Sequence, residues 1–209
     1  MFYDPRRDEH GLPRNPWTAV ITPRPIGWIS TRSKDGLANL APYSFFNAAA
    51  GSPPFVMFSS TPRKNSLTNI EETGVFAVNI ATWDLREQMN LSSAPFDGDL
   101  DEFRATGLEK AECRNIDVPR VAASPIAIEC ELYQTIPLEP KSGLPCLTTI
   151  VIGEVVGVHI DDAILTDGLI DTARMKPLSR LGYMDYAATD AVFEMLRPEP
   201  EEMARADYR

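Results

Sequence analysis

The sequence predicts a mainly β protein, an antiparallel β-barrel with helical insertions. The 209-residue chain contains 18 prolines at short intervals, which suits short strands joined by many turns. Lys34-Asp35-Gly36 has the chemistry of a hairpin turn and would make the flanking strands antiparallel. Residues 147–160 are rich in Thr, Ile and Val, and the glycines at 153 and 157 indicate bulges of the kind that barrels use. The regular alternation of strands and helices that a doubly wound parallel sheet needs is missing.

The elements follow from local composition. Aromatic and β-branched residues predict strands, which in chain order are Thr18–Thr22, Pro25–Ser33, Asn39–Ala48, Phe55–Ser60, Gly74–Ala81, Ala127–Thr135 and Leu147–Ile160. Helical signals predict Asn65–Thr73, Trp83–Leu91, Asp99–Thr106 and Ala187–Leu196. We expect one domain, residues 1–209, with a core of about residues 17–186. The polar tail, residues 197–209, is expected to be mobile or to pack on a neighbouring subunit.

Composition excludes several classes of function. Hydrophobic residues make up 44% of the chain, enough for a sizeable core without metal or disulfide staples. The 20 basic and 30 acidic residues leave a net charge of −10, which argues against nucleic acid as a partner. No apolar run approaches the roughly 18–20 residues that span a bilayer, so we expect a soluble protein without a membrane partner. Residues 1–66, however, hold eight basic and four acidic side chains, which would attract a small anion unless the clustering is chance.

Cysteine and histidine usage indicates a reduced, cytoplasmic protein. The three cysteines are odd in number and lack paired close spacing: Cys113, Cys130 and Cys146. No apolar leader is expected, because the residues after Met1 are mostly charged or polar. We expect all three to be small core residues. His10 and His159 lie far apart in the sequence, so no cysteine–histidine cluster and no metal site is expected. His159 is expected to be structural, with a contact to a nicotinamide phosphate as the alternative.

The most informative segment is Gly36–Pro62, which has 27 residues and no charged side chain. Small hydrogen-bonding residues are mixed there with Tyr43, Phe45 and Phe46. This composition is typical of a pocket wall for a flat ligand with apolar faces and polar edges. The alternative is a buried hairpin whose polar groups are all satisfied.

The residues that follow this segment predict an anion site. Arg63, Lys64 and several hydroxyls stand between a strand end and the first turn of a predicted helix, where backbone N–H groups are free. Ordinary N-capping by Asn65 or Ser66 is the alternative. Capping alone does not require two adjacent cations, because positive charge at a helix N-terminus is unfavourable. A flat-ligand wall that leads into a phosphate site indicates flavin mononucleotide, FMN.

These residues also resemble a known family. Arg24–Thr31 (RPIGWIST), Asn39–Asn47 (NLAPYSFFN), Pro53-Pro54 and Arg63–Ile70 (RKNSLTNI), in this order, resemble the flavin reductase-like family with the FMN-binding split-barrel fold. Later segments agree, namely residues 101–103, 124–125, 129–130, 152–156 and 177–182. Ala48-Ala49-Ala50 replaces a Ser-Val-Ser type segment, and residues 179–183 lack the histidine of many flavin reductases. The chain therefore looks closer to the flavoredoxin-like branch.

The resemblance implies an antiparallel Greek-key split barrel and a homodimer that binds FMN in a cleft between subunits. The isoalloxazine and ribityl chain would contact Ser30, Thr31, Tyr43, Ser44, Asn47 and Ala48. The phosphate region would be held by Ser59, Ser60, Arg63, Lys64, Ser66 and Asn69. Arg180 would lie near the flavin, unless it is a surface cation.

The implied activity is an oxidoreductase that moves hydride and electrons between NADH or NADPH, FMN and a small-molecule or protein electron acceptor. No catalytic side chain is expected, because the flavin carries the chemistry. Two alternatives remain at this point: an FMN-bound electron-transfer protein without its own nicotinamide site, and a barrel that binds another planar phosphate ester without redox chemistry.

Overall fold

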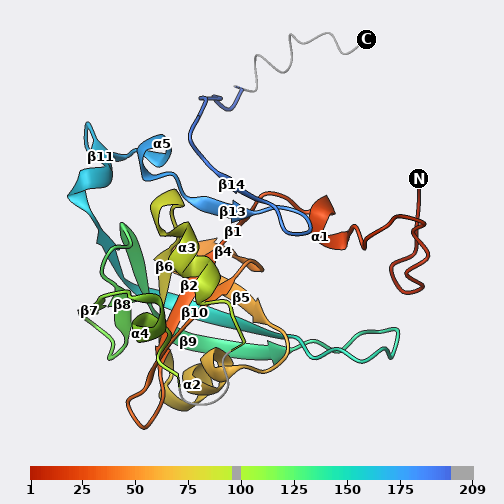
Figure 1. Cartoon of the computed structure of the whole chain (residues 1–209), viewed down its shortest axis with the longest axis horizontal. Helices are drawn as coiled ribbons and strands as arrows, with labels where there is room; N and C mark the ends of the chain where they lie inside the picture. Colours follow the sequence, from red (N-terminus) through yellow and green to blue (C-terminus); the bar gives the residue numbers. More distant parts are fainter. Residues whose placement is uncertain (96–99, 199–209) are drawn as a thin grey trace.

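The structure, a computed structural model, describes residues 1–95 and 100–198 (Figure 1). Its centre is a seven-stranded antiparallel sheet with the strand order β3-β2-β6-β9-β10-β5-β4. The strands are β2 (Gly27–Arg32), β3 (Ala38–Tyr43), β4 (Phe46–Gly51), β5 (Pro54–Ser60), β6 (Val75–Ile80), β9 (Ile126–Pro137) and β10 (Thr149–Ile160). The expected mainly β, antiparallel fold is confirmed.

The connection between β3 and β4 shows that this sheet curls into a barrel. The two strands stand at opposite ends of the strand order, yet only Ser44 and Phe45 join them. Strands are about 4.8 Å apart in a sheet, so two residues cannot bridge a flat sheet of this width. After β5 and α2 the chain returns to the other end of the sheet, where β6 pairs with β2. This return is the long connection of a Greek key. The barrel is thus split where β3 and β4 meet, and we call this line the seam.

The predicted turn and bulges are present. Residues 33–37 connect β2 and β3, with Gly36 at a φ of 86° and its N–H donating to the carbonyl of Ser33 at 2.9 Å. The register between β9 and β10 shifts beside Gly153 and again beside Gly157. These glycines also permit close packing, since a Cβ on Gly153 would lie 2.4 Å from Cζ of Phe76.

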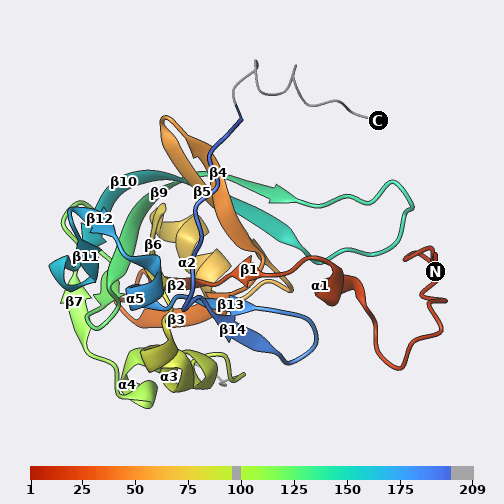
Figure 2. The same cartoon turned by 90° about the horizontal axis from the view of Figure 1, so that it is seen from above.

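Helices close the barrel end and cover one outer face. The nine-residue helix α2 (Asn65–Thr73) has the predicted limits and places Leu67 and Ile70 among the interior side chains. The predicted helix at 83–91 forms as η1 (Trp83–Leu85) followed by α3 (Arg86–Leu91). With α4 (Glu102–Thr106), α3 lies over β2 and β3 (Figure 2).

Besides the barrel interior, a second cluster of buried side chains lies between these helices and the barrel. It contains Trp28, Leu40, Met89 and Phe103, all fully or almost fully buried. Trp28 donates from Nε1 to Oγ of Ser92 at 2.9 Å, which ties β2 to the end of α3. Trp28 is therefore a core residue and not a surface on which a ligand ring could stack.

Short elements complete the described chain. β1 (Arg24–Pro25), β13 (Leu178–Arg180) and β14 (Tyr186–Ala188) form a three-stranded sheet beside the barrel. The others are β7 (Lys110–Glu112), β8 (Pro119–Val121), η2 (Asp162–Ile164), β11 (Leu165–Thr166), β12 (Leu169–Ile170) and α5 (Thr172–Met175). The sequence did not predict them, because elements of two to four residues are too short to show a period.

Three predicted elements are wrong. Residues 18–22 do not form a strand, because the chain turns helically after Pro16 and forms α1 (Trp17–Val20). The predicted strand at 39–48 is interrupted at the seam by residues 44–45. Residues 187–196 are not helical: Ala187 is paired with Ser179 in β14, and residues 191–198 are exposed, so no apolar face is buried.

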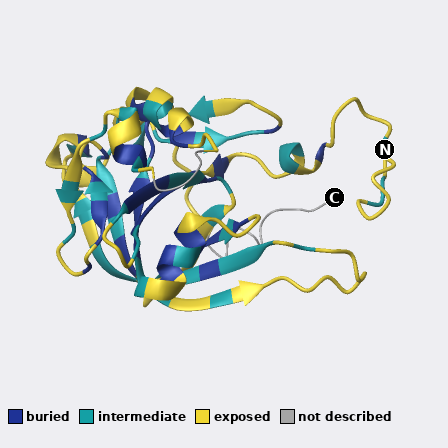
Figure 3. Ribbon diagram, turned by 60° about the horizontal axis from the view of Figure 1, so that its bottom comes forward, coloured by how far each residue is buried: buried dark blue, intermediate teal, exposed yellow. Residues whose placement is uncertain are grey.

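Some predicted features fall outside the described residues, namely the start of the 99–106 helix at Asp99 and the tail beyond Pro198. Within residues 1–95 and 100–198, no helix is both long enough and apolar enough to cross a membrane. The hairpin loop between β9 and β10 projects from the barrel, and its residues 138–145 are all exposed (Figure 3).

Candidate functional site

A polar groove runs beside β3, at the seam of the barrel. One part, which we call the helix-end cavity, has a volume of about 330 Å³ and lies between β3, the start of α2 and residues 92–95. A second part, the arginine cavity, has a volume of about 310 Å³ and includes Arg24, Phe45, Arg180 and Tyr186. Pro42 and Ser93 line both cavities, so the two parts adjoin.

The start of α2 faces the helix-end cavity without a side-chain cap. Lys64 is the N-cap residue, and no side chain among the described residues accepts a hydrogen bond from the first turn. The hydroxyl of Ser66 instead accepts from Nδ2 of Asn39 at 2.9 Å. The alternative of ordinary capping by Asn65 or Ser66 is therefore wrong. The N–H groups of the first turn and the Lys64 ammonium make this end of the groove attractive to an anion.

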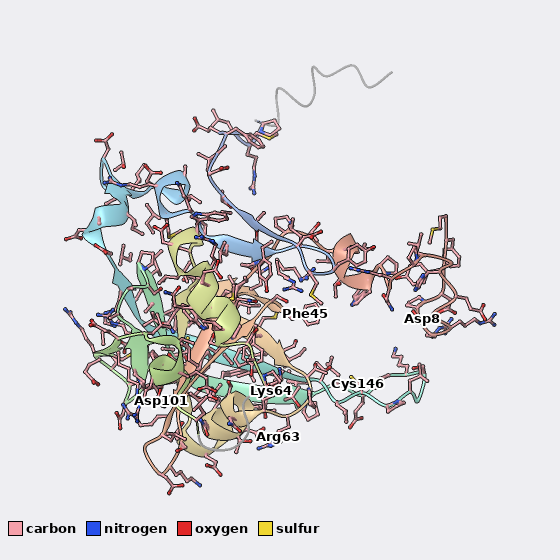
Figure 4. All side chains as sticks on the ribbon, in the orientation of Figure 1. Asp8, Phe45, Arg63, Lys64, Asp101 and Cys146 are labelled. Carbon is pink, nitrogen blue, oxygen red and sulfur yellow. The ribbon has the colours of Figure 1, made fainter. Side chains whose placement is uncertain are left out.

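The two adjacent cations are in different environments (Figure 4). Lys64 lines the helix-end cavity, and its Nζ is 5.8 Å from the ring centroid of Tyr43. Arg63 lines neither part of the groove. Its Nη2 lies 2.6 Å from Oε2 of Glu71, further along α2. Of the two cations predicted to hold the phosphate, the structure therefore brings Lys64 to the groove.

Tyr43, next to Pro42 on β3, has a buried hydroxyl in the barrel interior and lines neither cavity. The residue is 6% exposed, and its hydroxyl makes no well-aligned hydrogen bond to any described residue. Burial raises the pKa of Tyr43, while the nearby hydroxyls of Ser66 and Ser60 act in the opposite direction. Ser60 itself is buried and donates to the carbonyl of Pro62 at 3.0 Å. Tyr43 thus remains neutral at physiological pH.

Three other residues that were predicted to bind the cofactor take part in buried hydrogen bonds inside the barrel. Asn69 donates from Nδ2 to Oγ1 of Thr31 at 3.0 Å, which joins α2 to β2. Asn79 donates from Nδ2 to Oγ of Ser30 at 3.1 Å, which joins β6 to β2. Successive strand residues point to opposite faces, so Ser30 and Thr31 cannot both project into one pocket. None of Ser30, Thr31 and Asn69 lines the groove.

The remaining predicted residues lie near the seam. Ser44 lines the arginine cavity, and the N–H of Ser59 donates to the carbonyl of Phe45 at 2.9 Å. Asn47 and Ala48 are exposed on β4 and do not line the groove of this chain. The fold therefore brings Ser44, Lys64 and Ser66 to the groove and leaves Asn47 and Ala48 on an open surface.

Sequence reasoning missed Arg24 and Glu102. Arg24 is 6% exposed and donates to the carbonyls of Thr18, Ile21 and Leu181, while its Nε has no partner among the described residues. Glu102 lines the helix-end cavity and accepts from the backbone N–H of Leu40 at 3.0 Å. Burial raises the pKa of Glu102. The signal for Arg24 in the sequence was a single charged residue within an otherwise uncharged, largely apolar run.

A second polar cluster lies elsewhere, at a cavity of about 640 Å³ lined by Glu129 and His159. The expectation of no cysteine–histidine cluster is wrong: Cys113, Glu129 and His159 offer polar atoms within 4.8 Å of one another. Glu129 is 1% exposed and accepts 2.7 Å bonds from the N–H groups of Arg114 and Asn115 and a 2.5 Å bond from Nε2 of His159. Burial acts to raise the pKa of Glu129, but these donors outweigh it and lower the pKa.

Through these hydrogen bonds, Glu129 holds the loop after β7 against β9. Glu131, two residues further along β9, is by contrast exposed. Of the cysteines, Cys130 is a core residue as expected, but Cys113 and Cys146 are half-buried. Burial, aided by Glu129, raises the pKa of Cys113 to about 12, so its thiol is unreactive at neutral pH.

The fold and the groove define an antiparallel split-barrel protein with a polar cleft at its seam. The chain belongs to the flavin reductase-like family, because residues 20–179 match the model described as "Flavin reductase like domain". This membership supports flavin binding. The uncapped helix start and Lys64 fit such a group, since they line the groove and supply donors that no described residue uses.

Solved structures are similar over most of the chain. Nitrilotriacetate monooxygenase component B from Bacillus cereus is 30% identical, with 93% of this chain and 98% of that chain covered and a TM-score of 0.85. The 2-nitrobenzoate 2-nitroreductase of Pseudomonas fluorescens is 30% identical, with coverages of 87% and 88% and a TM-score of 0.77. Flavoredoxin of Desulfovibrio vulgaris (Miyazaki F) is 24% identical, covers 85% and 91%, and has a TM-score of 0.72; this likeness shows the shared fold.

Proposed function

We propose that the protein binds FMN in the groove and acts as a flavin oxidoreductase. One observation carries the proposal: an uncapped helix N-terminus with Lys64 at its N-cap opens into the groove beside β3. Backbone N–H groups at a helix start, together with a cation, form a site for a terminal phosphate. The phosphate of FMN would bind there, with Ser66 and Asn65 lining the same cavity.

The rest of the cofactor would extend along β3 toward the seam. Pro42, Ser44 and Ser93 line this path and combine apolar surface with short polar groups. The buried bonds from Asn69 to Thr31 and from Asn79 to Ser30 would act indirectly, by fixing α2 and β6 against β2. Arg63 would act on the helix through Glu71 and not on the phosphate.

When bound, FMN supplies hydride and electron transfer between a nicotinamide nucleotide and an acceptor. NADH or NADPH would be the reductant, and a small molecule or a protein the acceptor. The chain itself would hold the rings in position and exclude water from the seam. The monooxygenase component and the nitroreductase named above support an oxidoreductase role, since each of these relatives is 30% identical.

We also propose a cytoplasmic homodimer. The outer edge of β4 has no strand partner among the described residues, and its residues 47–51 are exposed and uncharged. Beside the seam Phe45 is 45% exposed, and Leu147 on the long hairpin is 71% exposed. A second copy packed on this face would cover these residues and bring Asn47 and Ala48 into a cleft between subunits. The free cysteines fit a reducing compartment.

The test begins with the ligand that the purified protein releases on denaturation, identified by chromatography. FMN is expected, and a protein that neither releases FMN nor binds added FMN would overturn the proposal. The holoprotein is then titrated anaerobically with NADH and with NADPH while the flavin absorbance is followed. Bleaching by either nucleotide supports reductase activity. Retention of FMN without bleaching would instead favour an electron carrier that is reduced by another protein.

A further inference from the structure

The arginine cavity carries an uncompensated positive charge. Arg24 and Arg180 both line it, and none of its lining residues is acidic. Neither arginine forms an ion pair with a carboxylate among the described residues. This is unusual in a chain with a net charge of −10. Two unpaired cations that face one cavity raise each other's electrostatic energy, and a bound anion would relieve it.

The fold holds both cations in place. Arg24 is anchored by the carbonyls of Ile21 and Leu181, and its guanidinium carbon lies 5.6 Å from the ring centroid of Phe45. Burial lowers the pKa of Arg24, and the charge of Arg180 lowers it further. The Nε–H of this buried side chain remains without a partner among the described residues. A donor that is buried and unused is costly unless a ligand accepts from it.

Arg180 is preorganised by its own hairpin. Its guanidinium carbon lies 4.4 Å from the ring centroid of Tyr186, and its Nη2 donates to the carbonyl of Tyr183 at 2.5 Å. Tyr183 and Tyr186 line the cavity together with Phe45, so its walls are aromatic as well as cationic. Aromatic walls favour a flat ring, and the guanidinium groups favour a carboxylate.

We propose that the arginine cavity binds the carboxylate of a small aromatic acid, the second substrate of the flavin site. This inference rests on the proposed function, which places the flavin along β3 next to Pro42 and Ser93, where the two cavities adjoin. The volume of about 310 Å³ is at the lower end of ligand sites. It accommodates a single-ring acid more readily than a whole dinucleotide.

Benzoate is the probe, and its neutral isostere benzamide is the chemical control. Calorimetric titrations are made with the FMN-loaded protein, with Arg180→Gln and with Arg86→Gln. Arg86 is the matched control, since its guanidinium carbon lies 4.2 Å from the ring centroid of Trp83, yet it does not line the arginine cavity. We expect benzoate to bind the wild type and Arg86→Gln, with affinity at least about tenfold lower in Arg180→Gln and for benzamide.

The outcomes separate this inference from the proposed function. A protein that holds FMN but does not bind benzoate, or binds it equally well after Arg180→Gln, overturns the inference alone. Benzoate that binds only the apoprotein and is displaced by FMN would assign the cavity to the flavin, which also overturns it. If NAD⁺ or NADP⁺ displaces benzoate and loses affinity equally in Arg180→Gln, the anion is the nucleotide phosphate and the aromatic-acid assignment is wrong. Absence of FMN binding would contradict the proposed function itself.

Discussion

The guanidinium of Arg63 lies 2.6 Å from the carboxylate of Glu71, eight residues further along the chain. This ion pair directs the first of two adjacent cations along α2, while the second, Lys64, lines the groove. In the sequence the two are equivalent neighbours. In the structure Arg63 pairs with a carboxylate of the helix, and Lys64 faces the proposed phosphate site.

Lys64→Ala should weaken FMN binding about ten- to a hundredfold, because a charge-assisted hydrogen bond is worth roughly 1.5–3 kcal/mol. Affinity for riboflavin, which has no phosphate, should hardly change. The apoprotein should be as stable or slightly more stable, since a cation at a helix N-terminus opposes the helix dipole. FMN and riboflavin titrations together with apo thermal melts measure these effects.

Arg63→Ala is the matched control. It removes an adjacent positive charge that does not line the groove. FMN affinity should change less than about threefold, and stability should fall by at most about 1 kcal/mol, because the ion pair is exposed to solvent. Equal losses of FMN affinity in the two variants would show that Arg63 also reaches the phosphate.

Gly153→Ala should destabilise the barrel by about 1–3 kcal/mol. The added Cβ would lie 2.4 Å from Cζ of Phe76, inside a fully buried cluster. Gly51→Ala is the control, because its Cβ would meet nothing within 4 Å. Urea unfolding of both variants decides the matter, and equal stabilities would mean that the bulge is not tightly packed.

Ser92→Ala should cost about 1–3 kcal/mol, because it leaves the buried Nε1–H of Trp28 without its acceptor. The same substitution in a Trp28→Phe background should cost much less, since that donor is gone. A double-mutant cycle on unfolding free energies measures the coupling. Additive effects would argue against the hydrogen bond between β2 and the end of α3.

Glu102→Gln should stabilise the apoprotein near neutral pH. Burial raises the folded-state pKa of Glu102, so the folded protein loses stability as pH rises through that pKa and the carboxyl must ionise. Glutamine removes this cost and can still accept from the N–H of Leu40. The gain in melting temperature should be present at pH 8 and absent below the unfolded pKa, near pH 3. A gain that persists at pH 3 would point to a cause other than ionisation.

Ala48→Arg should convert the expected homodimer into monomers, because it places a charge on the uncharged, exposed face of β4. Sedimentation equilibrium at micromolar concentration compares the variant with the wild type and with Lys141→Ala, a change at the exposed tip of the long hairpin. A wild-type monomer that still binds FMN would contradict the cleft between subunits.

Local chemistry was sufficient for several elements. Helix α2 begins and ends where the sequence predicts, because Gly74 adopts the left-handed conformation that ends helices, with a φ of 76°. The Asp35-Gly36 turn and the bulges at Gly153 and Gly157 follow from what glycine permits and larger residues do not. The break at Ser44 and Phe45 was not predicted, because the aromatic residues around it continue the strand pattern and closure of the sheet depends on tertiary packing.

The sequence by itself determined the family, the antiparallel barrel and the position of the α2 start at Asn65, which is proposed to bind an anion, since turns, caps and strand propensities act over a few residues. Only the tertiary structure decided which side chains share a cavity. Arg24 and Arg180 face one pocket because β1 pairs with β13, and Glu129 is buried because a loop near residue 114 covers its strand. These relations depend on packing between segments far apart in the chain, and the local pattern of neither segment contains them.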